Sequence, residues 1–140
     1  MTKAIDYYAV FGNPIEHSKS PLIHNFWIKK YSLNASYHKL KVSESELPSL
    51  VNDLRAEKIH GFNVTIPYKK AMLNLVDEIE PSAARSKAIN TVYKFGKKII
   101  GTNTDGAGFV SSLENDLNYK IKNKFNIVCV GAGGAAYGII

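Results

Sequence analysis

The chain has 140 residues, of which 45% are hydrophobic and 21% are charged, and these ordinary values exclude a disordered polypeptide. Its formal net charge of +6 is spread over scattered lysines without a basic stripe, so we expect a solvated surface and no nucleic-acid partner. No stretch has the pattern of a secretory signal or the length of a membrane span, so we expect no membrane partner and a cytoplasmic location.

The first half of the chain alternates between predicted strands and predicted helices. Apolar or alternating runs predict strands at 7–11, 36–42 and 61–66, and helical spacing of apolar residues predicts helices at 21–31 and 47–54. Ser20 before Pro21 predicts an N-cap for the first helix, and Ser43 with Glu46 has the spacing of a capping box. This alternating order is typical of an α/β fold with a mostly parallel sheet and flanking helices.

The second half continues with shorter elements and ends in a separate segment. Helical patterns occupy 71–76, 80–87 and a stretch from 107 onward, and two strands at 88–95 and 98–101 surround a Gly96-Lys97 turn. Residues 115–126 are polar and rich in lysine, as expected of a connection between domains. We therefore expect an α/β domain at 1–114, followed at 115–140 by a linker and the start of a second domain.

The third predicted strand ends in a polar segment. Val64 and Ile66 alternate with polar residues, which predicts a half-buried strand, and Pro67 ends it. Ligands bind at the carboxyl ends of strands in open α/β sheets, so Lys69 is placed to point into a crevice. The alternative is that Lys69 is one of many solvated lysines.

The last part of the sequence has the pattern of a dinucleotide-binding turn. An apolar strand at 127–130 leads into Gly131-Ala132-Gly133-Gly134-Ala135-Ala136, and Cys129 is expected to be a buried thiol in that strand. Gly131 permits a tight turn and Gly133 permits close approach of a pyrophosphate to the backbone. The sequence ends at Ile140, so we expect only the truncated start of a Rossmann domain. The four histidines show no metal-ligand spacing, and we assign no metal.

Five motifs together resemble the shikimate dehydrogenase family, in its order and at its usual spacing. They are Gly12-Asn13-Pro14 with His17-Ser18-Lys19-Ser20-Pro21, Asn63-Val64-Thr65-Ile66-Pro67 with Lys69, Ala88-Ile89-Asn90-Thr91, Asn103-Thr104-Asp105-Gly106, and Gly131-Ala132-Gly133-Gly134-Ala135. The resemblance covers the whole chain, which corresponds to about the amino-terminal half of a family member.

This resemblance implies a reversible, NADP-dependent reduction of 3-dehydroshikimate to shikimate, a step toward chorismate and the aromatic amino acids. It implies that Lys69 and Asp105 form the catalytic pair and that both also contact the substrate. The remaining implied contacts are Ser18 and Ser20 with the substrate carboxylate, Thr65, Asn90 and Asp105 with ring hydroxyls, and Gly131, Ala132, Gly133, Gly134 and Ala135 with NADP.

These residue types suit that chemistry. Shikimate is a small anion with several hydroxyls, so its site needs short donors and acceptors at fixed positions. Hydride reduction of a ketone places negative charge on oxygen, which the Lys69 ammonium neutralises by donating a proton. Each residue also has a purely structural alternative: Ser20 as a helix cap, Asn90 as a strand-edge residue, and Asp105 as part of an ordinary turn.

Two other functions stay open at this point. The chain fits a non-catalytic shikimate-binding or assembly module that cannot hold NADP alone, and it also fits a quinate/shikimate dehydrogenase. The apolar strand at 127–130 would lack sheet neighbours, which favours association with another chain, with a homodimer as one form.

Overall fold

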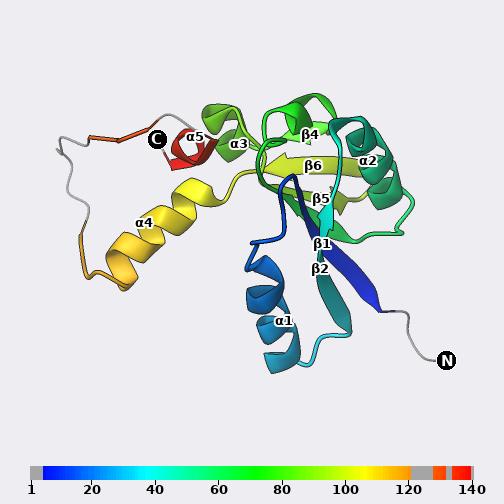
Figure 1. The fold of residues 1–140 in the computed structure, drawn as a ribbon, viewed down its shortest axis with the longest axis horizontal. Helices are drawn as coiled ribbons and strands as arrows, with labels where there is room; N and C mark the ends of the chain where they lie inside the picture. Colours follow the sequence, from blue (N-terminus) through cyan, green and yellow to red (C-terminus); the bar gives the residue numbers. More distant parts are fainter. Residues whose placement is uncertain (1–4, 121–127, 132–133, 140) are drawn as a thin grey trace.

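A computed structural model, which describes residues 5–120, 128–131 and 134–139, shows a twisted sheet flanked by helices (Figure 1). The strand order is β2-β1-β3-β5-β6-β4. The strands are β1 (Asp6–Gly12), β2 (Ala35–Lys41), β3 (Gly61–Val64), β4 (Glu78–Ile79), β5 (Thr91–Phe95) and β6 (Lys98–Thr102). The helices are α1 (Ser20–Lys30), α2 (Leu47–Arg55), α3 (Pro81–Ser86), α4 (Asp105–Asn115) and α5 (Gly134–Ile139), with short 3-10 turns η1 (Glu44–Glu46) and η2 (Ala71–Asn74).

Most strands run in one direction. β1 is parallel to both β2 and β3, and β4 is parallel to β6. β5 alone runs against its neighbours, because it pairs antiparallel with both β3 and β6. The expected α/β fold with a mostly parallel sheet is therefore confirmed. This topology brings the carboxyl ends of β1, β3 and β6 to the same edge as the amino end of β5.

The central strand β1 buries side chains on both faces of the sheet. Ala9 and Phe11 point into the main core, which α2 covers, whereas Val10 packs with Ile15 and Tyr37 on the face beside α1 (Figure 1). Burial on both faces explains why the sequence of this strand is continuously apolar rather than alternating. The main core also holds Leu47, Val51, Leu54, Phe62, Val64, Met72, Val92 and Ile99.

Helix α1 forms where the sequence predicts it, but its start and its packing differ from the expectation. Ser20 is the first helical residue, and the N-cap position is Lys19 without a capping side chain, so the predicted cap by Ser20 is wrong. The Ser18 hydroxyl instead accepts a hydrogen bond from the Ser20 amide at 3.3 Å. No residue of α1 is fully buried, and Leu22, Ile23, Phe26, Trp27 and Tyr31 are exposed.

The predicted capping box before α2 is confirmed. The Glu46 carboxylate accepts a hydrogen bond from the Ser43 backbone amide at 2.7 Å and from the Ser43 hydroxyl at 2.6 Å. These contacts satisfy a backbone donor that has no partner inside the helix. They fix the chain as it passes through η1 into α2.

Two predicted strand boundaries are wrong. β3 ends at Val64, and Ile66 is 60% exposed, because the chain turns after Thr65 and the Tyr68 amide donates to the Thr65 carbonyl. β5 begins at Thr91 rather than at residue 88. The hairpin turn itself is confirmed, since Gly96 has a φ of +59° that suits glycine.

The described residues before α5 also differ from the expectation. Residues 128–130 form no strand, and the Cys129 thiol is exposed rather than buried. Val128 and Val130 are 87% and 96% exposed, and a strand without a neighbouring strand has no partner for its backbone groups. Ile127, the first residue of the predicted strand, lies outside the described residues.

None of the helices in the described ranges is both long enough and apolar enough to cross a membrane.

We expect acid to weaken the fold through Asp77. Two hydrogen bonds from Arg55, at 2.8 and 2.9 Å, together with one from the Ile99 amide, hold the pKa of Asp77 at about 2, below its usual 3.8. Because folding lowers this pKa, the contribution of Asp77 to stability is complete above pH 3.8 and is lost as the pH falls toward about 2. Urea denaturation should show a smaller fall in the free energy of unfolding over this window for Asp77→Asn than for the wild type. Equal falls would contradict this prediction.

Candidate active site

The sheet topology places three of the predicted site residues at one edge of the sheet. Lys69 follows β3, Asn90 directly precedes β5, and Asp105 begins α4 just after β6. Because β5 runs against β3 and β6, its amino end lies beside their carboxyl ends. Segments that are far apart in the sequence therefore meet where ligands bind in open α/β sheets.

These three side chains are joined by short hydrogen bonds. The Lys69 ammonium donates to Asp105 Oδ2 at 2.7 Å, and Asn90 Nδ2 donates to Asp105 Oδ1 at 2.7 Å. The side chains of Lys69 and Asp105 are only 15% and 25% exposed, whereas every other ion pair between described residues has one side chain that is at least 40% exposed. Partly buried charges require such partners, because each charge loses contact with water.

The backbone around Lys69 is held by contacts on both sides. The Lys69 carbonyl accepts a hydrogen bond from the Ile89 amide at 2.8 Å, which ties this turn to the segment that carries Asn90. The neighbouring Tyr68 is buried, and its hydroxyl donates to the Val42 carbonyl at 2.7 Å. Lys69 therefore projects from a fixed turn rather than from a solvated loop.

Asn103 positions Asp105 at the start of α4. The buried Asn103 side chain accepts a hydrogen bond from the Asp105 amide at 2.9 Å and donates to the Ala88 carbonyl at 2.9 Å. The Asn103 backbone N–H donates to the Ser82 hydroxyl at 3.2 Å. In addition, the start of α4 favours a carboxylate through the helix dipole.

Ser18 and Thr65 lie in the loops that follow β1 and β3, and Ser20 begins α1 directly after the first of these loops, at the same edge of the sheet. Thr65 packs closely on the end of β1, since a Cβ added to Gly12 would lie 2.5 Å from Thr65 Cγ2. Within the part of the chain that the structure describes, no hydrogen bond joins these three residues to the Lys69–Asn90–Asp105 cluster. The structure thus brings Lys69, Asn90 and Asp105 together, and it places Ser18, Ser20 and Thr65 after the ends of β1 and β3, at the same edge of the sheet.

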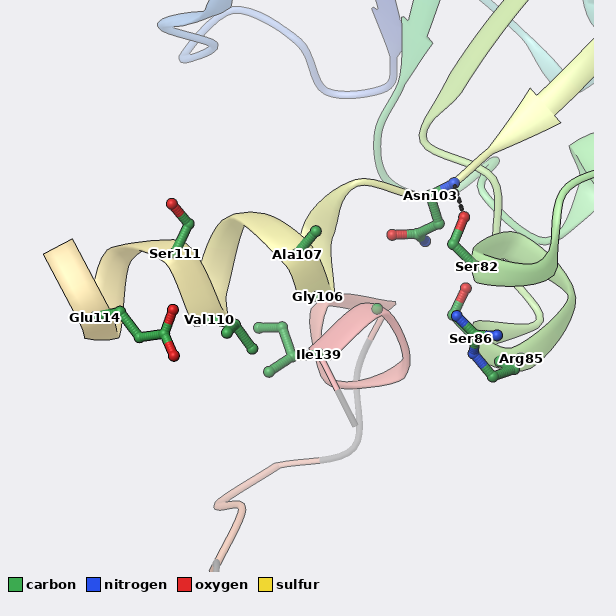
Figure 2. A pocket seen from close by; sticks show the side chains of 11 residues that line it. Ser82, Arg85, Ser86, Asn103, Gly106, Ala107, Val110, Ser111, Glu114 and Ile139 are labelled. Atoms are coloured by element: carbon green, nitrogen blue, oxygen red, sulfur yellow. Dashed lines mark hydrogen bonds between the residues drawn. The ribbon is translucent and has the colours of Figure 1, made fainter. Parts of the chain in front are cut away.

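A cavity of about 580 Å³ opens next to this cluster, between α3, α4 and α5. Figure 2 shows Ser82, Arg85 and Ser86 of α3 on one side, Val110 of α4 and Ile139 of α5 on the other, and the hydrogen bond between Asn103 and Ser82. Its lining reaches Asn103 and Gly106, which flank Asp105 in the sequence. Space is therefore present between the sheet domain and the glycine-rich segment.

The described part of the glycine-rich segment fits a dinucleotide-binding turn. Gly131 has a φ of +109°, a conformation that favours glycine, and nothing lies within 4 Å of a Cβ added there. Helix α5 begins at Gly134 and includes Ala135, and such a site requires a helix that begins in this part of the motif. Ala132 and Gly133 lie outside the described residues. Helix α5 approaches the cluster closely, because a Cβ on Gly138 would lie 2.5 Å from Asp105 Oδ2.

Comparison with known proteins gives one consistent match. The sequence profile of the shikimate dehydrogenase substrate binding domain matches residues 10–92. A curated relative from Pelagibacter ubique, named shikimate dehydrogenase (NADP(+)), is 47% identical over 133 residues, which make up 95% of this chain and 49% of the relative. The chain therefore spans about half the length of the curated relatives it matches.

Solved structures agree with the sequence match. A shikimate dehydrogenase solved in complex with NADP+ matches with a TM-score of 0.89 and 39% identity, over 96% of this chain and 46% of that one. The Thermus thermophilus enzyme in complex with shikimate matches with a TM-score of 0.87 and 33% identity, over 96% of this chain and 51% of that one. The profile match covers more than half of the chain, so this protein belongs to the shikimate dehydrogenase family through its substrate-binding domain.

Proposed function

We propose that this chain is the substrate-binding half of an NADP-dependent shikimate dehydrogenase, which reduces 3-dehydroshikimate reversibly to shikimate. The observation that carries the proposal is the hydrogen-bonded cluster of Lys69, Asn90 and Asp105 at the ligand-binding edge of the sheet. This cluster combines a proton donor, a carboxylate and an amide within one partly buried site. The names of the relatives and the shikimate bound to the Thermus thermophilus structure support the choice of substrate.

The proposal assigns substrate contacts by the chemistry of each side chain. The Ser18 and Ser20 hydroxyls would donate to the substrate carboxylate. Short neutral donors suit a small anion that must be released from the site after the reaction. Thr65, Asn90 and Asp105 would hold ring hydroxyls. The partial burial of Ser18, Ser20 and Thr65 supports this assignment, since each is screened from solvent but still accessible.

Lys69 would act as the general acid in the reductive direction. NADPH, when bound, supplies the hydride that reaches the carbonyl carbon. Lys69 Nζ donates a proton to the carbonyl oxygen, which becomes a hydroxyl, and the lysine is left neutral. Asp105 orients the ammonium through the 2.7 Å contact and accepts from a substrate hydroxyl. In the oxidative direction the neutral lysine takes the proton back.

The phosphate-binding turn for NADP would be formed by Gly131, Ala132, Gly133, Gly134 and Ala135.

We also propose that the substrate-binding domain comprises residues 1–114 and that the connection to the second domain begins at residue 115. Helix α4 supports this division, because it ends at Asn115 and is the last described element before the glycine-rich segment.

We further propose that the protein forms a homodimer through α1, because this helix exposes Leu22, Phe26 and Trp27 on its surface. Sedimentation velocity should give a dimer for the wild type and a monomer for Phe26→Asp. A wild-type chain that is monomeric at all concentrations would contradict this assembly.

Calorimetry on this 140-residue chain tests the substrate assignment. We expect shikimate to bind without cofactor, and Asn90→Ala to weaken binding by about ten-fold through loss of hydrogen bonds. Asn115→Ala, the same change at an exposed asparagine, is the matched control and should bind as the wild type does. A second titration with NADP+ measures cofactor binding separately.

Two results would count against the proposal. A folded chain that does not bind shikimate would show that these residues do not form a substrate site in this chain. Tighter binding of quinate than of shikimate would identify a different preferred substrate.

A further inference from the structure

Hydrogen bonds fix the orientation of the Asn90 side-chain amide. Asn90 is 8% exposed, and its Oδ1 accepts from the Thr104 backbone amide at 3.1 Å and from the Thr91 hydroxyl at 2.8 Å. A backbone N–H can only donate, so the Asn90 atom that faces it must be the carbonyl oxygen. Asn90 Nδ2 therefore points the other way, toward Thr104 Oγ1 at 2.9 Å and Asp105 at 2.7 Å.

Asn63 fixes the direction of the Thr91 hydroxyl. Asn63 Nδ2 lies 3.2 Å from the main-chain carbonyl of Asn90, which can only accept, so this atom must be the nitrogen. The same nitrogen donates to Thr91 Oγ1 at 2.9 Å. The single hydroxyl hydrogen of Thr91 is then free to bind Asn90 Oδ1.

Tyr37 on β2 begins a row of hydrogen bonds that continues through Asn63, Thr91 and Asn90 to Asp105. Its hydroxyl donates to Asn63 Oδ1 at 2.6 Å, and burial raises the pKa of the phenol, which keeps it protonated. The Tyr37 ring stacks on His24 with centroids 4.1 Å apart, and its backbone exchanges two hydrogen bonds with the Asn25 side chain at 2.7 and 3.0 Å. The far end of the row is therefore held in place by α1.

We propose that Thr91 is a positioning residue, which holds the Asn90 amide in the orientation that donates to Asp105. This inference rests on the proposed function, in which Asp105 orients Lys69 and the substrate. The hydrogen bonds from Tyr37 through Asn63 and Thr91 to Asp105 all run in one direction, and such chains strengthen each successive donor. Thr91 acts on the active site only through Asn90.

Replacement of Thr91 by valine isolates this role. Valine has nearly the same shape but no hydroxyl, so Asn63 Nδ2 and Asn90 Oδ1 each lose a partner. Asn63, Thr91 and Thr104 line a cavity of about 700 Å³ on the α1 side of the sheet, from which water can reach the broken contacts. The Asn90 amide keeps its contacts with Thr104 and Asp105, so it should be held less tightly while the sheet stays intact.

Thr102→Val is the matched control. Thr102 pairs directly with Thr91 on the adjacent strand β6, so both substitutions remove a threonine hydroxyl at the same level of the sheet. The Thr102 hydroxyl contacts Ser82 and the Glu80 carboxylate rather than the Asn90 side chain. Thr91→Ser provides the conservative variant, since it restores the hydroxyl.

Nuclear magnetic resonance on the ligand-free chain gives the first measurement. Solvent exchange of the Asn90 side-chain amide protons should be about ten-fold faster in Thr91→Val, which corresponds to one lost neutral hydrogen bond. Thr91→Ser and Thr102→Val should exchange as the wild type does. Calorimetry with shikimate should show about ten-fold weaker binding for Thr91→Val alone.

The two measurements separate this inference from the proposed function. If the wild-type chain does not bind shikimate, the substrate assignment fails, and exchange of the Asn90 amide still decides the role of Thr91. An unchanged exchange rate in Thr91→Val overturns the inference, and so does a Thr91→Ser variant that behaves like valine. If Thr91→Val does not fold, Thr91→Ala, which also lacks the hydroxyl, is measured by the same criteria.

Discussion

Replacement of Lys69 by alanine is expected to lower the turnover number of a full-length protein carrying this chain by about 10²- to 10⁴-fold, the usual contribution of a general acid. The Lys69 ammonium is held 2.7 Å from Asp105 and is mostly buried, so bulk water is a poor substitute for it. Without it, the negative charge that develops on the carbonyl oxygen has no nearby proton donor. The rate of NADPH-dependent reduction of 3-dehydroshikimate, followed by absorbance, gives the turnover number.

The matched control for this prediction is Lys70→Ala, which removes an exposed ammonium from the next residue. Turnover should stay near the wild-type value, because the Lys70 side chain is exposed, whereas that of Lys69 is mostly buried. The Kd of shikimate for the Lys69→Ala chain should change little, since the proposed substrate contacts come mainly from serine, threonine and asparagine side chains. Undiminished turnover in Lys69→Ala would refute the assignment of the general acid.

The meeting of Lys69, Asn90 and Asp105 could be anticipated from the sequence. Lys69 and Asp105 follow predicted strands and Asn90 lies near the start of another, and the alternation of strands and helices predicts a sheet in which such positions share an edge. This argument needs only the order and type of the elements, which local apolar patterns supply. It does not need the exact strand boundaries, two of which, the end of β3 and the start of β5, differ from the prediction by two and three residues.

The row from Tyr37 to Thr91 could not be anticipated in this way. Asn63 and Thr91 are direct partners in the antiparallel β3–β5 pair, and this register places their side chains in contact. Register depends on how both strands pack against the rest of the core, so no local pattern specifies it. The alternation of polar and apolar residues around Asn63 therefore predicts a strand, but it does not predict the contact between Asn63 and Thr91.

The incorrect expectations at Ile66 and Cys129 have a common cause. In both cases an apolar pattern predicts burial in a strand, but a strand also needs a neighbour for its backbone groups. At Ile66 the chain leaves the sheet, because the Thr65 carbonyl is used in a turn with Tyr68. The Cys129 segment has no sheet neighbour among the described residues.

Replacement of Phe11 by alanine is expected to lower the free energy of unfolding by about 3–5 kcal/mol, the usual cost of deleting a buried aromatic side chain. Phe11 is fully buried on the central strand β1, and its ring packs on Phe62 with centroids 4.8 Å apart. Both neighbouring strands pair with β1 at this position, so the backbone cannot easily move to fill the cavity. Urea denaturation followed by circular dichroism measures this change.

Phe95→Ala is the matched control, since Phe95 is 75% exposed at the end of β5 and its loss should change stability by less than about 0.5 kcal/mol. A similar loss in both variants would contradict the central role of Phe11 in the core. The Phe11 carbonyl also accepts the Thr65 amide at 2.9 Å, which ties the core to the loop that carries a proposed substrate contact. Phe11→Ala should therefore weaken shikimate binding as well, even though its side chain lies on the core face of the sheet.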